Sequence, residues 1–199
     1  WTYENGNIDE GVEFSELCVP EGYTYVPDDN FEQALIDLTY DDILDDYVLT
    51  ENISDVTSMN ISNYQNEEDY VSDLTGIGGF TALTYLNCSF NQLTSLNLSA
   101  NTALDTLYCR SNSLTSLDVS ANTDLAYLNC NYNELTSIDV SNNTALTHLS
   151  FFSNDLTTLD VSANTDLAYL NCDYNELTSL DVSSNTALTN LDCSENQLT

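Results

Sequence analysis

From residue 83 onward, apolar and polar positions recur every 21 residues. Each unit opens with Leu, carries a second Leu three residues later, then Cys or Phe, and then Asn. The four columns are Leu83, Leu104, Leu125, Leu146, Leu167 and Leu188; Leu86, Leu107, Leu128, Leu149, Leu170 and Leu191; Cys88, Cys109, Cys130, Phe151, Cys172 and Cys193; and Asn91, Asn112, Asn133, Asn154, Asn175 and Asn196. Six units in register predict a solenoid of stacked coils.

The segment around the second Leu of each unit alternates apolar and polar residues, which is the period of a β-strand. We expect Leu86 and Cys88 to point inward, and equivalent strands to pair in parallel about 4.8 Å apart. Asn91 follows the strand, where an inward amide can satisfy both N–H and C=O groups of the turn. The pattern L-x-x-L-x-C-x-x-N-x-L resembles the leucine-rich-repeat signature and predicts a leucine-rich-repeat solenoid.

A weaker copy of the same spacing fills the second half of each unit, as in Leu93, Leu96, Leu98 and Asn101. The recurring SLDVS pattern favours short strands there too, and so a second parallel sheet on the opposite face. The alternative is a 3₁₀ or extended segment on that side.

The N-terminal part divides into three regions before the regular repeats at 83–199, of which the last is short. Residues 1–27 indicate a linker or the end of a preceding module. Residues 28–55 predict a helical N-terminal cap, with a helix over about 30–39, Asp29 as its N-cap and Glu32 three residues later. Residues 56–82 indicate a degenerate first coil with an acidic insertion loop.

The chain has 33 acidic residues, no Lys and a formal net charge of −32, with Arg110 as its only cation other than His148. This balance excludes DNA, RNA and anionic lipid as partners, because binding to them needs Lys and Arg. No apolar run is long enough to span a membrane.

Two groups of carboxylates are candidate Ca²⁺ ligands, because Ca²⁺ takes oxygen ligands. One group is Asp41, Asp42, Asp45 and Asp46, although its spacing lacks the regular calcium-loop pattern; the alternative is a solvated acidic cap. The other is the column Asp118, Asp139, Asp160 and Asp181 on the second half of the coils. Neighbours there repel by ~0.9 kcal/mol per pair in water, which salt, raised pKa values or bound Ca²⁺ would ease. No other cofactor is expected.

Five of the six cysteines occupy one inward column. Their expected Cβ separation of about 4.8 Å exceeds the ~3.8 Å typical of a disulfide, so we expect free, buried thiols. Cys18 lies outside the column, and its partner stays open.

Aromatic residues gather on the outward positions of the first strand and just beyond it. Such side chains beside Asn and Asp suit contacts with a protein or a glycan. The candidate binding residues are Tyr85, Tyr108, Arg110, Tyr127, Tyr132, His148, Phe152, Tyr169 and Tyr174. Tyr pairs across strands also stabilise a sheet that binds no ligand.

Catalysis finds no support, because His148 is the only His and its column neighbours are Tyr127 and Tyr169. The sequence therefore favours a binding or adhesion module over an enzyme. The alternative is a structural building block, a spacer or filament element, that assembles end to end through its coils with or without Ca²⁺.

Residues 25–199, including VPDDNFEQALIDL and FTALTYLNCSFNQLTSLNLSANTAL, resemble the leucine-rich-repeat region of secreted proteins from Bacteroidetes, including Flavobacteria. They are more distantly similar to internalin-type repeats. This resemblance implies export, display on the cell surface or release, and a partner on a cell or matrix surface.

Overall fold

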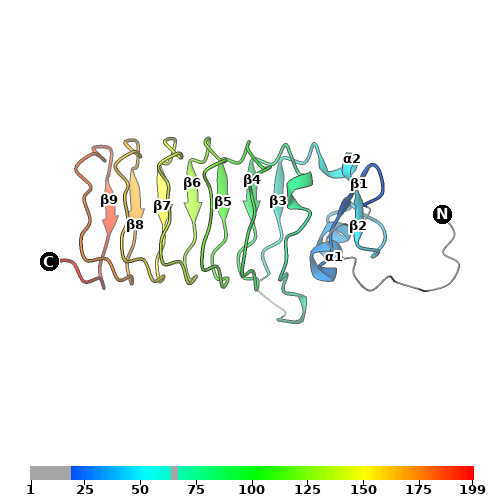
Figure 1. Cartoon of the computed structure of the whole chain (residues 1–199), viewed down its shortest axis with the longest axis horizontal. Helices are drawn as coiled ribbons and strands as arrows, with labels where there is room; N and C mark the ends of the chain where they lie inside the picture. The colour runs from blue at the N-terminus through cyan, green and yellow to red at the C-terminus, as the bar shows by residue number, and fades with distance from the viewer. Residues whose placement is uncertain (1–18, 64–66) are drawn as a thin grey trace, which may run out of the picture.

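The computed structural model describes residues 19–63 and 67–199, which form a straight stack of coils with a small cap at the N-terminal end (Figure 1). Each coil contributes one short strand to a seven-stranded parallel sheet in chain order. These strands are β3 (Ser58–Asn60), β4 (Tyr85–Asn87), β5 (Thr106–Tyr108), β6 (Tyr127–Asn129), β7 (His148–Ser150), β8 (Tyr169–Asn171) and β9 (Asn190–Asp192). The predicted leucine-rich-repeat solenoid is confirmed.

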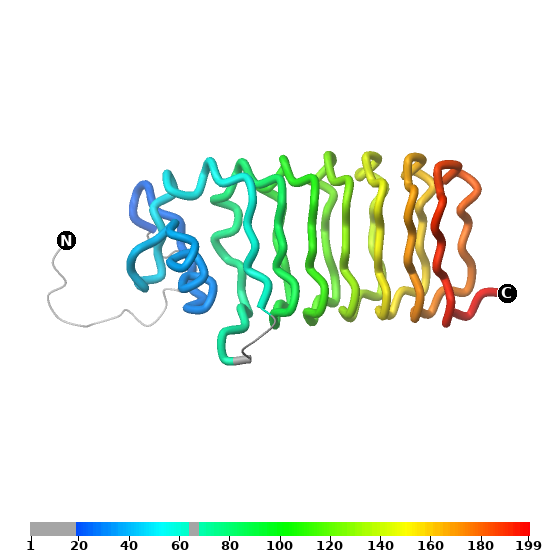
Figure 2. The backbone as a smooth tube through the Cα atoms, turned by 180° about the vertical axis from the view of Figure 1, so that it is seen from behind, coloured from blue at the N-terminus to red at the C-terminus, as the bar shows by residue number. Residues whose placement is uncertain are grey.

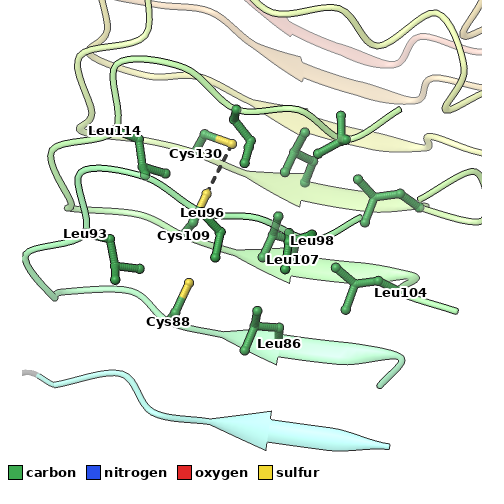
Figure 3. Packing of buried hydrophobic residues seen from close by; sticks show 14 of the residues in the cluster. Leu86, Cys88, Leu93, Leu96, Leu98, Leu104, Leu107, Cys109, Leu114 and Cys130 are labelled. Carbon is green, nitrogen blue, oxygen red and sulfur yellow. Dashed lines mark hydrogen bonds between the residues drawn. The ribbon is translucent and has the colours of Figure 1, made fainter. Parts of the chain in front are cut away.

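The pairing register follows the sequence period, because Tyr85 lies opposite Thr106 and Thr106 opposite Tyr127. In-register stacking places each apolar column in one continuous core. Leu86, Cys88 and Leu93 of one coil are fully buried beside their equivalents in the next coil (Figure 3). Since every coil covers its neighbour, stability belongs to the stack rather than to a single coil.

Among the described residues, the side opposite the sheet carries extended chain rather than a second sheet. The course of this chain from coil to coil can be followed in the view from behind (Figure 2). Within the described residues, one isolated parallel bridge joins Asn97 and Asp118 there. The predicted second set of strands is therefore wrong, and the extended alternative holds. On this side Asp118 Oδ1 accepts the N–H of Ser120, two residues ahead, at 2.9 Å, and the same turn recurs at Asn97, Asp139, Asp160 and Asp181. Equivalent turns also end β4, β6 and β8, so the turn itself does not prevent pairing. The two sides differ in how the coils pair, since the parallel pairs β4 to β9 lie on the sheet side.

The cap combines a two-stranded antiparallel sheet with helices and is larger than the sequence predicted. β1 (Tyr23–Tyr25) lies in the stretch assigned to a linker and pairs with β2 (Tyr47–Leu49). α1 spans Asp29–Asp37 and α2 spans Thr50–Ile53. The predicted linker over residues 1–18, and Cys18 with it, lie outside the described residues.

The N-cap of α1 is Asp28 rather than the predicted Asp29, since Asp28 Oδ1 accepts the N–H of Phe31 at 2.9 Å. Glu32 does not complete a capping box. It is buried, and its Oε1 accepts the N–H groups of Asp45 and Tyr47 at 3.0 and 3.1 Å. Glu32 therefore holds the acidic segment against the helix.

The first coil joins the cap through two 3₁₀ turns, η1 (Glu67–Asp69) and η2 (Ile77–Gly79). The segment around η1 protrudes from the stack (Figure 1). Phe80 contacts the rings of Phe31 and Tyr40, with centroids 6.5 and 6.4 Å apart. Gly76, with φ +103°, passes so close to the cap that a Cβ would lie 2.7 Å from the carbonyl oxygen of Tyr25. Only glycine fits this junction.

Candidate functional site

Two ladders of buried Asn side chains fix the turns at either end of each strand. Asn133 is typical of the first: its Nδ2 donates to the carbonyls of Cys109 and Cys130 at 3.0 Å, and its Oδ1 accepts the N–H of Leu114 at 3.0 Å. The second ladder, which includes Asn143, donates to two carbonyls in the same way. The asparagine ladder predicted from the sequence is confirmed, and it gives every coil the same turn geometry.

That geometry puts the residue before each first-ladder Asn in the left-handed region of the backbone. Its φ lies between 46° and 58° in the six coils. The residues are Phe90, Ser111, Tyr132, Ser153, Tyr174 and Glu195. The coils of β4, β6 and β8 thus place an aromatic side chain where the backbone disfavours bulky residues.

Five rings form a continuous row along the strands, which we call the strand row: Tyr85, Tyr108, Tyr127, His148 and Tyr169. Consecutive centroids lie 4.7 to 6.0 Å apart. Tyr108 belongs to a different outward column from the other four. Its ring joins the row because Thr106, between Tyr85 and Tyr127 in the register, is small.

Burial raises the pKa of Tyr108 to about 12, and a hydrogen bond with the Tyr127 side chain adds to the shift. Tyr108 is thus a neutral hydroxyl held between two other tyrosines. The strand row behaves as a packed unit rather than as separate side chains.

A second row lies just past the strands and is called the turn row: Phe90, Arg110, Tyr132, Phe152 and Tyr174. The guanidinium carbon of Arg110 lies 5.2 Å from the Phe90 ring centroid and 5.0 Å from that of Tyr132. Tyr132 and Tyr174 meet Phe152 edge to face at 4.9 and 5.5 Å. Tyr132 is 43% exposed and Tyr174 is 54% exposed.

All nine residues predicted for the binding face lie in these two rows, which together we call the aromatic face. Phe90 completes it, and the sequence places Phe90 in the same position as Tyr132 and Tyr174. The left-handed backbone beneath them is the feature that sequence reasoning missed. In the sequence, the only feature that marks this left-handed backbone is its fixed position, directly before each Asn of the first ladder.

The structure gives neither group of candidate calcium ligands three converging side chains. Among the described residues, no three His, Cys, Asp or Glu side chains lie close enough to hold a metal ion. Burial raises the pKa of Asp41, and the charges of Asp45 and Asp42 add to the shift. Asp42 and Asp46 are exposed.

Of the three ways in which the repulsion along the Asp column could be eased, raised pKa values do not occur. Hydrogen bonds from the side chain and backbone of Ser120 lower the pKa of Asp118. Equivalent serines lower the pKa values of Asp139, Asp160 and Asp181. The column therefore remains charged, because local hydrogen bonds outweigh the repulsion between neighbours.

The cysteines of the repeats are free, as predicted, and four of them are fully buried. Cys109 and Cys130 have their sulfurs 3.3 Å apart (Figure 3). The hydrogen bond with Cys130, together with burial, raises the pKa of Cys109, and burial raises that of Cys172 to about 12. These thiols are packing groups rather than nucleophiles.

His148 Nδ1 lies 3.0 Å from the Thr147 hydroxyl, and its ring stacks with Tyr127 and Tyr169. No buried nucleophile contacts it in the part of the chain that the structure describes. No helix there is both long and apolar enough to cross a bilayer.

The fold and the repeat signature define the chain as a leucine-rich-repeat solenoid with a cysteine column. No family model matches it. Over 78 residues, or 39% of the chain, it is 44% identical to internalin J of Listeria monocytogenes serotype 4b, of which it spans 8%. The solved functional domain of internalin J, which includes a cysteine ladder, is 36% identical with a TM-score of 0.68; the match covers 89% of this chain and 44% of that one.

A solved internalin (inlF) of the same species is 24% identical with a TM-score of 0.64, and the match covers 88% of this chain and 58% of that one. At that identity the likeness concerns the fold alone. The repeats are thus internalin-like, which confirms that part of the predicted resemblance. The resemblance to Bacteroidetes proteins stays a prediction.

Proposed function

We propose that the chain is a protein-binding module that captures its partner with the aromatic face. The observation that carries this proposal is the pair Tyr132 and Tyr174, two exposed aromatic side chains on left-handed backbone. A left-handed L-residue costs roughly 1–2 kcal/mol, and such strain concentrates at functional sites.

The fold itself does not require an aromatic residue at these positions. Ser111 and Ser153 occupy the same place in the intervening coils with the same backbone conformation. Packing between neighbouring coils uses only part of these two rings: both meet Phe152 edge to face, yet Tyr132 and Tyr174 stay 43% and 54% exposed. A ligand that uses their exposed area explains the choice of residue.

The ring geometry favours a protein over a glycan. Tyr127, His148 and Tyr169 stack with interplanar angles of 20° and 18°, so their faces turn toward one another. Sugars stack on open ring faces, whereas ring edges and hydroxyls suit the mixed apolar and polar contacts of a protein interface.

A partner outside the cell follows from the same proposal. Similarity to internalin J supports a protein that is secreted or held at the cell surface. From the resemblance of the repeats to secreted Bacteroidetes proteins, we infer that the chain itself comes from a member of the Bacteroidetes.

Two screens of the purified protein test this function. In one, peptides that bind the protein are selected from a displayed random library; in the other, the protein is applied to a glycan array. We expect selected peptides that bind the wild type and fail to bind a Tyr132→Asn, Tyr174→Asn double variant. Peptides that bind both proteins equally, or binding to glycans alone, would overturn the proposal. Assembly through the coil ends, the structural alternative, leaves the aromatic face unused, so the double variant would assemble normally.

A further inference from the structure

Arg110 is the only Lys or Arg in a chain with 33 acidic residues, yet it forms no ion pair within the described residues. Its contacts are aromatic instead: Phe90 lies one coil before it and Tyr132 one coil after it, with the guanidinium between the two rings. In so acidic a protein, an Arg that served only the fold would be expected to contact a carboxylate.

The hydrogen-bonding capacity of this guanidinium is unused. Its Nε is buried without an acceptor, and no described carbonyl or side chain accepts from its terminal nitrogens, which are not buried. The buried Nε is out of reach of an incoming ligand, so the terminal nitrogens, which are not buried, are the donors that an oxygen ligand can meet. Because rings flank the guanidinium along the stack, its N–H edge is the part left for a ligand.

Resting on the proposed function, we propose that Arg110 is the anchor for a carboxylate of the protein partner, an Asp or Glu side chain or a C-terminus. The planar fork of Arg matches a carboxylate with two parallel hydrogen bonds. The field of the acidic chain repels an anion in proportion to its charge, so a singly charged carboxylate is favoured over a phosphate.

The surroundings of Arg110 define the rest of the segment that binds. Glu134, Asp155 and Glu176 are exposed and lie two or three residues beyond the turn-row residues Tyr132, Phe152 and Tyr174. The carboxylate must therefore be carried by a segment that is otherwise neutral or basic. The inferred motif is one acidic residue with apolar and basic neighbours.

The first test needs no partner, because a single Arg gives a single side-chain resonance. In protein labelled with ¹⁵N-arginine, acetate should shift the Nε–H signal of Arg110 saturably, and chloride at equal ionic strength should not. A shift that rises linearly and equally with both salts would overturn the carboxylate site.

The second test uses peptides selected on the wild-type protein, with Arg110→Gln as the variant and its melting temperature as the folding control. We expect acidic residues to be enriched among peptides whose binding requires Tyr132 and Tyr174, and Arg110→Gln to weaken those peptides at least about tenfold. Face-dependent peptides that bind Arg110→Gln as tightly would overturn this inference and leave the proposed function standing. If no peptide depends on the aromatic face, both fail.

Discussion

Asp28 Oδ2 accepts the backbone N–H of Ser72 at 2.9 Å and the Ser72 hydroxyl at 2.7 Å, which ties the cap to the loop before the first regular coil. The same carboxyl group caps α1 through Phe31 and accepts the N–H of Asp73 at 2.9 Å. One side chain therefore joins helix, loop and solenoid.

Asp28→Ala should destabilise the protein by roughly 2 kcal/mol, because it removes the N-cap and three further hydrogen bonds together. Urea denaturation followed by circular dichroism measures the loss. Asp37→Asn, at the exposed end of the same helix, is the matched control and should change little. Equal effects of the two variants would show that Asp28 does not join the cap to the coils.

The same carboxyl group predicts an acid sensitivity. Burial alone would raise the pKa of Asp28, but hydrogen bonds from Ser72, Phe31 and Asp73 outweigh it and lower the pKa below 3.8. A lowered folded pKa stabilises the protein fully above 3.8, and this contribution is lost as the pH falls toward the folded pKa. Carboxyl groups titrate roughly between pH 5 and pH 2. Over this range, Asp28→Asn should therefore lose less stability than the wild type does.

Tyr108 predicts a complementary effect in alkali. Its pKa of about 12 exceeds the ordinary value of 10.0, so its contribution is complete below pH 10 and is lost as the pH rises through about 12. Tyr127→Phe removes one hydroxyl and should lower the pKa of Tyr108, whereas Tyr169→Phe, one His ring further on, should not. The tyrosinate absorbance of each protein, minus that of its Tyr108→Phe derivative, reports the titration. Identical curves for the two variants would contradict the Tyr108–Tyr127 hydrogen bond.

Asp139→Asn should keep the turn and remove a charge from the Asp column, because Asn97 forms the same turn with Ser99. We expect slightly lower stability than the wild type at neutral pH, because the lowered pKa of Asp139 means that folding favours its charged form. Asp139→Ala loses the acceptor and should be less stable than Asp139→Asn. Denaturation with Ca²⁺ and with chelator tests the calcium prediction, since a bound ion would stabilise the wild type more than Asp139→Asn.

The buried thiols should be inert in the native state. In a Cys18→Ser background, we expect Cys193, which is partly exposed, to react with a thiol reagent first. Cys88, Cys109 and Cys130 should react only on unfolding, because all three side chains are fully buried. The raised pKa values of Cys88 and Cys109 also keep these two as protonated thiols. Rapid modification of all five in the folded protein would contradict the packed core.

The repeat period alone was enough to predict the solenoid, the inward cysteines and the ladder of Asn133 and its equivalents. Each of these depends on one residue per coil and on identical stacking. The second sheet could not be predicted in the same way. The alternation in SLDVS matches a strand, but pairing depends on how neighbouring coils stack on that side, where the described residues form one isolated bridge, between Asn97 and Asp118.

The site was predictable as a set of residues but not as an arrangement. Reading columns placed Tyr108 and Tyr127 apart, whereas the small Thr106 lets their rings meet at 4.7 Å. The N-cap was misplaced by one residue, because Asp28 and Asp29 are chemically equivalent and only the contacts with Ser72 distinguish them. Both outcomes depend on contacts with neighbouring parts of the structure, and the residue pattern of a single repeat does not show those contacts.

We propose that Tyr132 and Tyr174 serve a ligand at the expense of backbone strain. Tyr132→Asn with Tyr174→Asn should relieve that strain, because Asn tolerates the left-handed region better than an aromatic residue does. Edge-to-face contacts with Phe152, worth about 0.5–1.5 kcal/mol each, are lost at the same time. The contact between the Tyr132 ring and Arg110 is lost as well. Because gains and losses are of similar size, we expect a melting temperature close to that of the wild type.

Ser111→Asn with Ser153→Asn is the matched control, at the same backbone position in the intervening coils. It should not lower stability and should keep the binding of face-selected peptides. The most direct test therefore measures two quantities for each double variant: its affinity for one such peptide and its melting temperature. We predict that only the Tyr132, Tyr174 double variant loses affinity for the peptide, and that its stability is not reduced. Retained affinity, or a large fall in its melting temperature, would show that the two rings serve the fold rather than a partner.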